Sequence, residues 1–424
     1  MTGMQANSRL TRHLTVLMTC AVLLSAPARA QEHGPANRKT TDNGHRATTN
    51  RIVTLDQIVV TARRVERPVR EAFSGMTVLF SGDIEEGQAN TVPELLVNSP
   101  GIYVEDEAGS GIGSKVNLRG FTTEMAGHHL VLVDGVPQNS INDKLVDWNL
   151  IPISNIERIE IVRGPLSTLY GENAMSGVMN IVTRGRQSPE ETLLYGTYGS
   201  FETFKWGLRT GRVAGPVDYR FSLGRITTDG YREHGDADYR HVSSELGIQP
   251  GAGSRVSVRA QYSEVERGAY PWALSEEQLR EDRNQARPGT ENDSGETGKF
   301  NITASCEKRL DDAYLLRLTG YFRNEDGESY YTSGQTPAST AEILHDETVY
   351  GASPSFTIEG ALLDMPHILV TGVDVERASY DYNKYAAPFR ARAERESSYD
   401  VTRDRIGVYA EDEVAVNDRL HFLL

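Results

Sequence analysis

Alternation of apolar and polar residues is the dominant pattern of the chain from Glu191 onward. Ten segments follow it, and each has about the length that a strand needs to cross a bilayer at a tilt. These segments are residues 192–199, 203–213, 217–228, 239–249, 254–265, 298–309, 313–324, 348–358, 367–379 and 404–415. Because side chains on a strand point to alternate faces, the pattern predicts an antiparallel sheet with one apolar face.

The connectors between these segments alternate in length. The short ones are residues 214–216, 250–253, 310–312, 360–366 and 416–418, and the long polar ones are residues 229–238, 266–297, 325–347 and 380–403. Short turns at one end and long loops at the other are typical of an outer-membrane β-barrel, with the long loops outside the cell. The connector 200–202 is an exception, because it is short at the long-loop end. An eleventh strand is expected to begin at His421.

Residues 70–185 show a different, mixed pattern. Short apolar runs predict strands, and the capping-box spacing of Thr91 and Glu94 predicts a helix over residues 91–98. The predicted strands are residues 76–80, 116–119, 130–133, 158–162 and 178–182. A second capping-box pair, Ser154 and Glu157, precedes the fourth strand, and Asp134 with Gly135 predicts a hairpin turn. These signals predict a separate α+β domain.

The end of this domain, residues 154–183, is rich in glycine. Gly164, Gly171 and Gly177 permit tight turns or close backbone approach between two strands. A phosphate-binding loop is excluded because no lysine followed by serine or threonine closes the stretch, and a strand-like run follows it. From spacing alone, an ordinary turn in any α+β domain and a more specific motif are equally weighted interpretations of the stretch.

The N-terminus has the pattern of a secretory signal. Residues 1–30 contain a basic start, an apolar core over residues 14–24 and a small-x-small cleavage site at residues 28–30. Residues 31–54 are almost free of apolar side chains and predict a disordered leader. The β-prone segment 55–63 follows, and it could be an ordinary edge strand or could add to the sheet of a partner protein.

Composition narrows the function classes. The net charge of −15 makes a nucleic-acid partner improbable. Mean hydropathy is −0.45, which is compatible with strands that face lipid with every second residue. Cys20 lies within the signal, which leaves Cys306 alone, so no intrachain disulfide and no cysteine metal site are expected.

The sequence gives only weak signals for catalytic or metal-binding groups. His128 and His129 are adjacent, but no neighbouring residues complete a triad or a metal-hydrolase spacing. The acidic residues 236–238 could bind Ca²⁺, although a solvated loop is the favoured interpretation. The sequence therefore predicts no enzyme, no metal site and no resident cofactor.

Residues 154–183 resemble the end of the plug domain of TonB-dependent outer-membrane receptors. The matching residues are 156–160, 163–165, Ser167, 169–171, Ala174, Gly177, Val178 and 180–183. The resemblance continues upstream through residues 94–96, 100–101, 118–121 and 131–136. Residues 56–62 resemble the TonB box, so the similarity covers residues 56–184 almost without a gap.

This resemblance implies a fold: an α+β plug domain, residues 70–185, inside a transmembrane antiparallel β-barrel. Barrels of this family have 22 strands, so residues 190–424 are expected to form the N-terminal part of one, with the barrel incomplete in this chain. The chain is then either a fragment of a longer product or a truncated receptor.

The resemblance also implies a function. We expect energy-coupled uptake of a ferric siderophore across the outer membrane of a Gram-negative bacterium, with TonB and outer-membrane lipid as partners. Cobalamin or another large nutrient is the alternative cargo. A passive porin-like barrel and a non-transporting fragment remain further alternatives.

Candidate site residues follow from the same resemblance. TonB would contact Asp56, Gln57, Ile58, Val59, Val60, Thr61 and Ala62, and Arg119 and Arg163 would hold the plug to glutamates of the barrel. Plug loops 105–114, 121–129 and 138–149 are expected to face outward and meet the cargo. The candidate cargo-binding residues are Tyr103, Phe121, His128, His129, Trp148, Tyr270, Trp272, Tyr330 and Tyr331. For the tyrosines, packing in loops or in an interfacial girdle is an equally weighted alternative.

Overall fold

The computed structural model of the protein describes residues 59–60, 64, 67–68, 75–106, 114–121, 128–268, 273–334, 336–362, 365–417 and 420–423. It divides into two units. In the first unit, β1 (Val59–Val60) pairs antiparallel with β2 (Arg67–Pro68). The second unit contains Arg64 and every other element, both in the plug and in a large sheet.

The plug is built on a five-stranded sheet of order β3-β8-β9-β6-β7. Its strands are β3 (Met76–Phe80), β6 (His129–Val133), β7 (Val136–Pro137), β8 (Ile156–Arg163) and β9 (Gly177–Thr183). β6 and β9 are parallel, and the other pairs are antiparallel. β4 (Ile102–Glu105) and β5 (Lys115–Leu118) form a separate pair. The short helices are α2 (Ser81–Glu86), α3 (Val92–Leu96), η3 (Trp148–Leu150), η4 (Ile153–Asn155) and α4 (Ser167–Tyr170).

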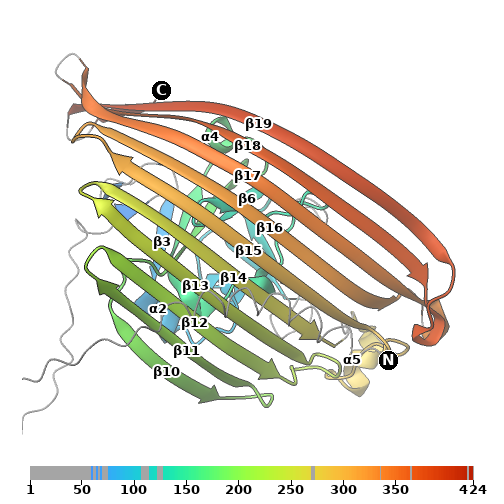
Figure 1. Ribbon diagram of the computed structural model, residues 1–424. Coiled ribbons are helices and arrows are strands. Elements are labelled where there is room, and N and C mark those ends of the chain that lie inside the picture. Colours follow the sequence, from blue (N-terminus) through green and yellow to red (C-terminus); the bar gives the residue numbers. More distant parts are fainter. Residues whose placement is uncertain are drawn as a thin grey trace, which may run out of the picture. The chain divides into compact units, whose positions relative to one another are not determined.

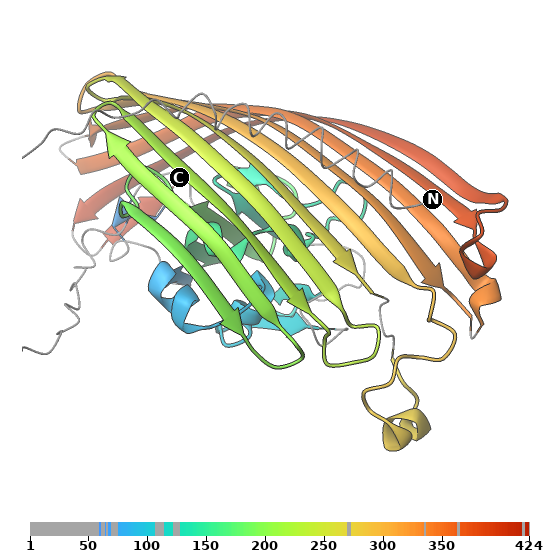
Figure 2. The same ribbon diagram turned by 60° about the horizontal axis from the view of Figure 1, so that its bottom comes forward.

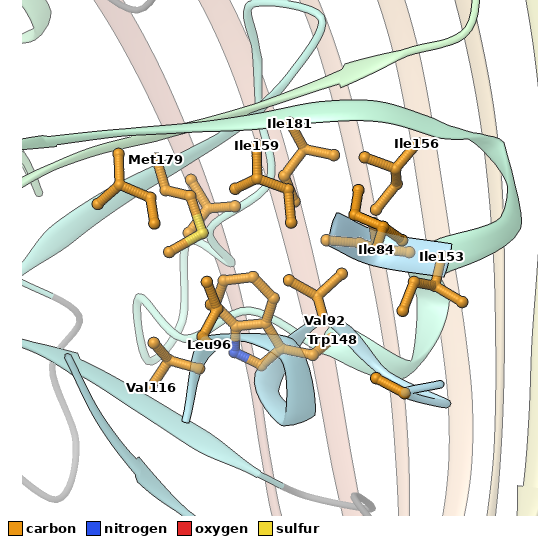
Figure 3. Packing of buried hydrophobic residues seen from close by; sticks show 14 of the residues in the cluster. Ile84, Val92, Leu96, Val116, Trp148, Ile153, Ile156, Ile159, Met179 and Ile181 are labelled. Atoms are coloured by element: carbon orange, nitrogen blue, oxygen red, sulfur yellow. The ribbon is translucent and has the colours of Figure 1, made fainter. Parts of the chain in front are cut away.

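An apolar core holds the plug together. Figure 3 shows Trp148 of η3 beside Leu96 and Val116, together with Ile159 and Ile181 of the sheet. All five side chains are buried. Their burial removes apolar surface from water, which is the main stabilising contribution available to a domain of this size.

Gly177 is required where β9 begins. Its φ is +154°, and a Cβ atom there would lie 2.3 Å from the carbonyl oxygen of Val162 and 2.5 Å from a methyl group of Leu118. No larger residue fits without displacing β8 or β5. The glycine predicted from sequence for close backbone approach is therefore confirmed at this position.

The large sheet contains eleven strands in chain order, and each pairs antiparallel with the next. They are β10 (Glu191–Tyr198), β11 (Phe204–Ala214), β12 (Val217–Thr228), β13 (Ala237–Gly251), β14 (Ser254–Arg267), β15 (Ser294–Arg309), β16 (Tyr314–Thr332), β17 (Thr340–Leu362), β18 (Met365–Ala386), β19 (Arg395–Asn417) and β20 (Leu420–Leu423). In the described part of the chain, β10 and β20 are its two unpaired edges, so the sheet is open (Figure 1). Figure 2 shows α5 (Glu276–Glu281) in the connector that projects beyond β14 and β15.

The two faces of the large sheet differ in chemistry. Large apolar side chains are exposed on the outer face, such as Leu318 of β16 and Val408 of β19. The inner face, which contacts the plug, carries buried charges such as Glu245 and Arg323. This alternation agrees with the predicted sheet. None of the helices in the described residues is both long and apolar enough to cross a membrane.

The predicted long loops 325–347 and 380–403 are wrong. β16, β17, β18 and β19 run for 19, 23, 22 and 23 residues, and they continue through most of both segments. Asp326, Asp346, Asp381 and Asp400 lie in directly opposed positions there. Backbone pairing does not need apolar side chains outside a membrane, so the hydrophobic pattern marked only part of each strand.

The predicted capping box at Ser154 is also wrong. The turn there is η4, whose N-cap is Pro152, and no side chain caps it. The hydroxyl oxygen of Ser154 instead lies 3.0 Å from Nε2 of His241 on β13. A contact with a distant strand has taken the place of the local one.

Candidate functional site

A cavity of about 340 Å³ lies between plug loop 138–149 and the inner face of the large sheet. Its charged lining includes three carboxylates, Asp143, Asp147 and Glu325, and three cations. The cations are Lys115, Lys144 and Arg267. The cavity therefore offers both hydrogen-bond acceptors and donors, as is typical of a site for a polar ligand.

Asn139 shapes the plug side of the cavity. Its side-chain oxygen accepts from the Val131 amide at 2.9 Å, and its amide nitrogen donates to the carbonyls of His129 at 3.1 Å and Lys144 at 2.8 Å. The bonds to Val131 and His129 attach the loop to β6, and the bond to Lys144 holds the loop together. Sequence reasoning missed Asn139, because an asparagine in a loop carries no signal that shows which backbone groups its side chain will contact.

His129 and Trp148 form a neutral aromatic surface in the cavity. Their rings are stacked at 6.4 Å with an interplanar angle of 12°. Burial, with a smaller contribution from His128, lowers the pKa of His129 to about 4. Burial also raises the pKa of Asp147, whose carboxylate accepts from the Asn149 amide at 3.0 Å. Both shifts result mainly from the removal of water around the charged form.

A row of aromatic side chains on the large sheet begins at the cavity, where His345 and Tyr380 belong to the lining. His345 stacks on Tyr380 at 6.2 Å, and Tyr399 stacks on Tyr380 at 6.1 Å and on Tyr382 at 4.7 Å. The plug's Asn142 accepts from the Tyr399 hydroxyl at 3.0 Å. Sequence reasoning missed this row of aromatic residues because residues 325–347 and 380–403 were predicted to be loops. The alternation of Tyr380 and Tyr382 was the available signal.

Of the predicted cargo-binding residues that the structure describes, His129 and Trp148 come together in the cavity lining. Phe121 and His128 contact each other at 5.9 Å outside it, and Tyr103 is exposed on β4. Their role stays a prediction.

Tyr330 and Tyr331, the described cargo-binding candidates of the long connectors, do not line the cavity. Tyr330 lies under the guanidinium of Arg390, 4.1 Å from the ring centre, and donates to Glu342 at 3.2 Å. Tyr331 follows it on β16 and is not part of the lining. Tyr270 and Trp272 lie outside the described residues.

Several polar contacts join the plug to the large sheet. Plug carboxylates bind sheet arginines in three pairs, Asp134 with Arg259, Glu172 with Arg403 and Glu85 with Arg209. Glu347 of β17 accepts from the Ser140 hydroxyl at 2.7 Å and the Ile141 amide at 3.0 Å. The signs of these three pairs are opposite to those expected, in which plug arginines would meet barrel glutamates, whereas Arg184 with Glu191 of β10 has the expected sign.

Arg163 has other partners than the predicted barrel glutamates. It donates to the carbonyls of Pro100 at 2.8 Å and Gly75 at 3.2 Å and to the Thr77 hydroxyl at 2.8 Å, all within the plug. The reason is that β8 pairs with β3, which places these oxygens around the guanidinium. Arg119 is exposed, with a φ of +61°. Contacts of either residue with a barrel glutamate stay a prediction.

Arg64, which belongs to the second unit, contacts both the plug and the large sheet. Its guanidinium binds Asp374 of β18 in a bidentate pair at 3.1 and 2.6 Å. It also lies 4.5 Å from the ring centre of Tyr170 in the plug and 4.0 Å from that of Tyr409 in β19. Bidentate pairing and cation–π contact both strengthen a desolvated guanidinium site. We call these four residues the Arg64 anchor.

Arg64 lies two residues after the end of the predicted TonB-contact segment at Ala62. Within that segment, Val59 and Val60 form β1. Asp56, Gln57, Ile58, Thr61 and Ala62 lie outside the described residues.

Comparison with known families decides the classification. The TonB-dependent receptor plug domain model matches residues 68–178, and the TonB-dependent receptor-like beta-barrel model matches residues 250–424. The chain belongs to the TonB-dependent receptor family. The predicted fold class is thereby confirmed, with a plug and an incomplete barrel of the outer-membrane type.

Relatives of this receptor include vitamin B12 transporters. It is 38% identical over 143 residues to BtuB of Vibrio vulnificus, which is 34% of this chain and 23% of the relative. It is 30% identical over 223 residues to BtuB of Photobacterium profundum, or 50% of this chain and 36% of the relative. The matches thus span about a quarter to a third of these relatives.

Solved structures of similar fold include siderophore receptors. The unliganded ferric citrate transporter FecA matches with a TM-score of 0.73 at 18% identity, over 83% of this receptor and 55% of FecA. The FpvAI–pyocin S2 complex matches with a TM-score of 0.71 at 14% identity, over 86% and 53%. At these identities the matches establish the fold.

Proposed function

We propose that this receptor imports a bulky organic nutrient across the outer membrane of a Gram-negative bacterium, with TonB acting on residues 56–62. The observation that carries this proposal is the Arg64 anchor. A segment pulled from the periplasm would transmit force directly to Arg64, which contacts plug and sheet together. The apolar outer face would meet lipid, and residues 1–30 and 31–54 would be the cleaved signal and the leader.

Cobalamin is the cargo that we favour. The relatives named above are vitamin B12 transporters, and the cavity combines a neutral stacked pair, His129 and Trp148, with carboxylates that accept hydrogen bonds from amide donors. A ferric siderophore, the cargo expected from the sequence, is the second candidate. Lys115, Lys144 and Arg267 could bind an anionic chelate of this kind, whose iron would be cargo.

Coupling requires that cargo and TonB favour the same conformation of the plug. Cargo can change the exposure of residues 56–62 only through contacts that differ between the bound and free states. The cavity supplies such contacts, because Lys144 of the plug and Tyr380 of the sheet both line it, and Asn142 of the plug donates to the Tyr380 hydroxyl at 3.5 Å. Closure of the plug loop on cargo would therefore alter the junction between plug and sheet.

Trp148 fluorescence tests the cargo. Its indole is buried in the cavity lining, so bound cyanocobalamin, which absorbs strongly, is expected to quench it in a saturable titration. The Trp148→Phe variant should lose the saturable component and keep the background from the other tryptophans. A ferric siderophore series is run in parallel. No saturable response to either cargo class would refute the cargo assignment.

A further inference from the structure

Two buried side chains of the large sheet bind the plug where loop 138–149 begins. Arg323 of β16 and Glu347 of β17 pair with each other, and each side chain is 3% exposed. Nη1 of Arg323 donates to the Pro137 carbonyl at 2.6 Å, and Nη2 donates to the Asn139 carbonyl at 3.4 Å. A barrel cation is thus bound to the plug backbone at two points.

Glu347 binds the residues that follow in the plug. One of its oxygens pairs with Arg323. The other accepts from the Ser140 hydroxyl at 2.7 Å and from the Ile141 amide at 3.0 Å. The ion pair therefore presents donors and acceptors side by side, and two carbonyls, one hydroxyl and one amide of the plug complement them. We call Arg323 and Glu347 the loop clamp.

An apolar contact reinforces the loop clamp. The Ile141 side chain is 7% exposed and packs in one buried cluster with Tyr321, Val349 and Ala378. These three residues belong to β16, β17 and β18 of the large sheet. Glu347 therefore fixes the backbone of residue 141, and three neighbouring strands hold its side chain.

The loop clamp lies outside the cavity but fixes one end of its lining. Neither Arg323 nor Glu347 belongs to the lining, whereas residues 138–140 and 143–149 of the loop do. The side chains that hold the loop are therefore different from those that would meet cargo. A change in the loop clamp can alter cargo binding only through the position of the loop.

We propose that the loop clamp positions plug loop 138–149 for cargo, so that Arg323 and Glu347 set the affinity as positioning residues; this inference rests on the proposed function. Cargo binds with full affinity only to the fraction of receptors whose loop is already in place. Ordering a loop during binding lowers the affinity. The loop clamp orders residues 137–141 in advance, so closure on cargo involves only the rest of the loop.

The geometry requires arginine at the cationic position. A planar guanidinium can reach Glu347 and two carbonyls at the same time, whereas the ammonium of lysine is a point charge on a flexible stem. Arg323→Lys therefore keeps the buried charge pair and weakens the contacts with the plug backbone. Glu347→Gln would instead leave a buried cation unpaired and would change the stability as well.

Hydrogen exchange of the receptor in detergent micelles tests the loop clamp without cargo. In Arg323→Lys, exchange of peptides from residues 138–149 is expected to be about tenfold faster, because one strong and one weak hydrogen bond are lost. Exchange of β9 in the plug should not change. The matched control is Arg309→Lys, because Arg309 of β15 also pairs with a glutamate of β17, Glu359, but at the short-turn end of both strands. Unchanged exchange of the loop in Arg323→Lys would overturn the proposal.

Cyanocobalamin titration separates positioning from folding. In Arg323→Lys, the dissociation constant is expected to rise about tenfold while the number of binding sites per receptor stays at the wild-type value. A role in stability alone would lower the number of sites at an unchanged dissociation constant, and this result would overturn the proposal.

A second variant leaves the charges of the loop clamp in place. Ile141→Ala removes the apolar contact with the sheet, so it should also accelerate exchange of the loop and weaken cyanocobalamin binding. Faster exchange with unchanged affinity in both variants would overturn the positioning role. If the wild-type receptor binds neither cyanocobalamin nor ferric siderophores, the cargo assignment fails, while hydrogen exchange still decides whether Arg323 holds the loop.

Discussion

The interior of the plug and its contact with the large sheet are built from different chemistry. The largest apolar cluster lies within the plug, where Leu96, Ile159 and Ile181 pack around Trp148. The contact between plug and sheet has smaller apolar clusters and a set of charged pairs, such as Asp134 with Arg259 and Glu172 with Arg403. Close-packed apolar side chains resist rearrangement, whereas ion pairs can exchange partners.

This difference suggests how a plug could move and remain folded. The plug's own core does not need the barrel, because all its members belong to the plug, in α2, α3, β5, β6, η3, η4, β8, β9 and the adjoining loops. The contact with the barrel can rearrange by exchange of charged partners, such as Glu172 and Glu376, which share Arg403. The following predictions test each half of this contrast, starting with the largest effect.

Breaking the buried pair between Arg323 and Glu347 should have the largest effect. Both side chains are 3% exposed, and Arg323 also donates to the carbonyl of Pro137 in the plug. Arg323→Leu leaves a buried carboxylate without its cation, so we expect a loss of about 4 kcal/mol in the free energy of unfolding. Chemical denaturation in detergent micelles measures it.

Two controls identify the cause. Arg323→Leu combined with Glu347→Gln removes both charges and should recover most of the loss. Arg377→Leu removes an exposed cation, paired with Asp404 at 69% and 66% exposure, and should have little effect. An equal loss in the single and double variants would show that packing, and not charge, joins plug and sheet here.

Truncation in the plug core should have the next largest effect. Ile159 is fully buried, and Ile159→Ala is expected to cost about 3 kcal/mol through lost burial and the cavity left behind. The control Val408→Ala changes a 77% exposed side chain on the outer face and should cost much less. A small effect of Ile159→Ala on plug unfolding would mean that the barrel, and not this core, maintains the plug.

Stability should fall on acidification through His129. Its folded pKa of about 4 is below the ordinary value of 6.5, so the unfolded chain binds the proton more readily between these values. The contribution of His129 to the free energy of unfolding is therefore present at pH 7 and is lost as the pH falls. At pH 5 the loss is about 2 kcal/mol. Denaturation at both pH values measures it.

The matched variants are His129→Phe and His128→Phe. The first should reduce the difference between pH 7 and pH 5, and the second, at the adjacent half-buried position, should keep it. An unchanged pH dependence in His129→Phe would assign the effect to other groups.

The smallest effect is expected for a single hydrogen-bonded contact between plug and barrel. Asn142→Ala removes the bonds with Tyr399 and Tyr380, and it should weaken cyanocobalamin binding by about fivefold, the equivalent of one ordinary hydrogen bond. Fluorescence titration measures this. Unchanged affinity would mean that cyanocobalamin binding does not depend on the contact of Asn142 with Tyr380 and Tyr399.

Much of the fold could be predicted from the sequence because local patterns determine it. β3 begins and ends as predicted, at Met76 and Phe80, and the alternation located the strands of the large sheet to within a few residues where their outer face is apolar. The ends of β16 to β19 were missed because polar residues occupy both faces there. Alternation of hydrophobicity disappears although the backbone pairing continues.

The contacts between plug and barrel could not be predicted in the same way. Arg259 and Arg403 are polar positions in alternating strands, and nothing local distinguishes an arginine facing the plug with a carboxylate partner from a solvated one. Arg163 illustrates the same point from within the plug, since a prominent arginine in a motif binds oxygens of its own domain. Partners that are distant in sequence are fixed by register and packing, which the chain expresses only when folded.

Deletion of residues 56–62 tests the central claim most directly. Uptake of radiolabelled cyanocobalamin is compared in cells with the wild-type receptor, with the deletion variant, and with the wild-type receptor but no TonB. The account predicts that the deletion and the loss of TonB each abolish accumulation while cyanocobalamin still binds to isolated outer membranes. Accumulation that continues at the wild-type rate after the deletion would contradict it and would identify a passive barrel.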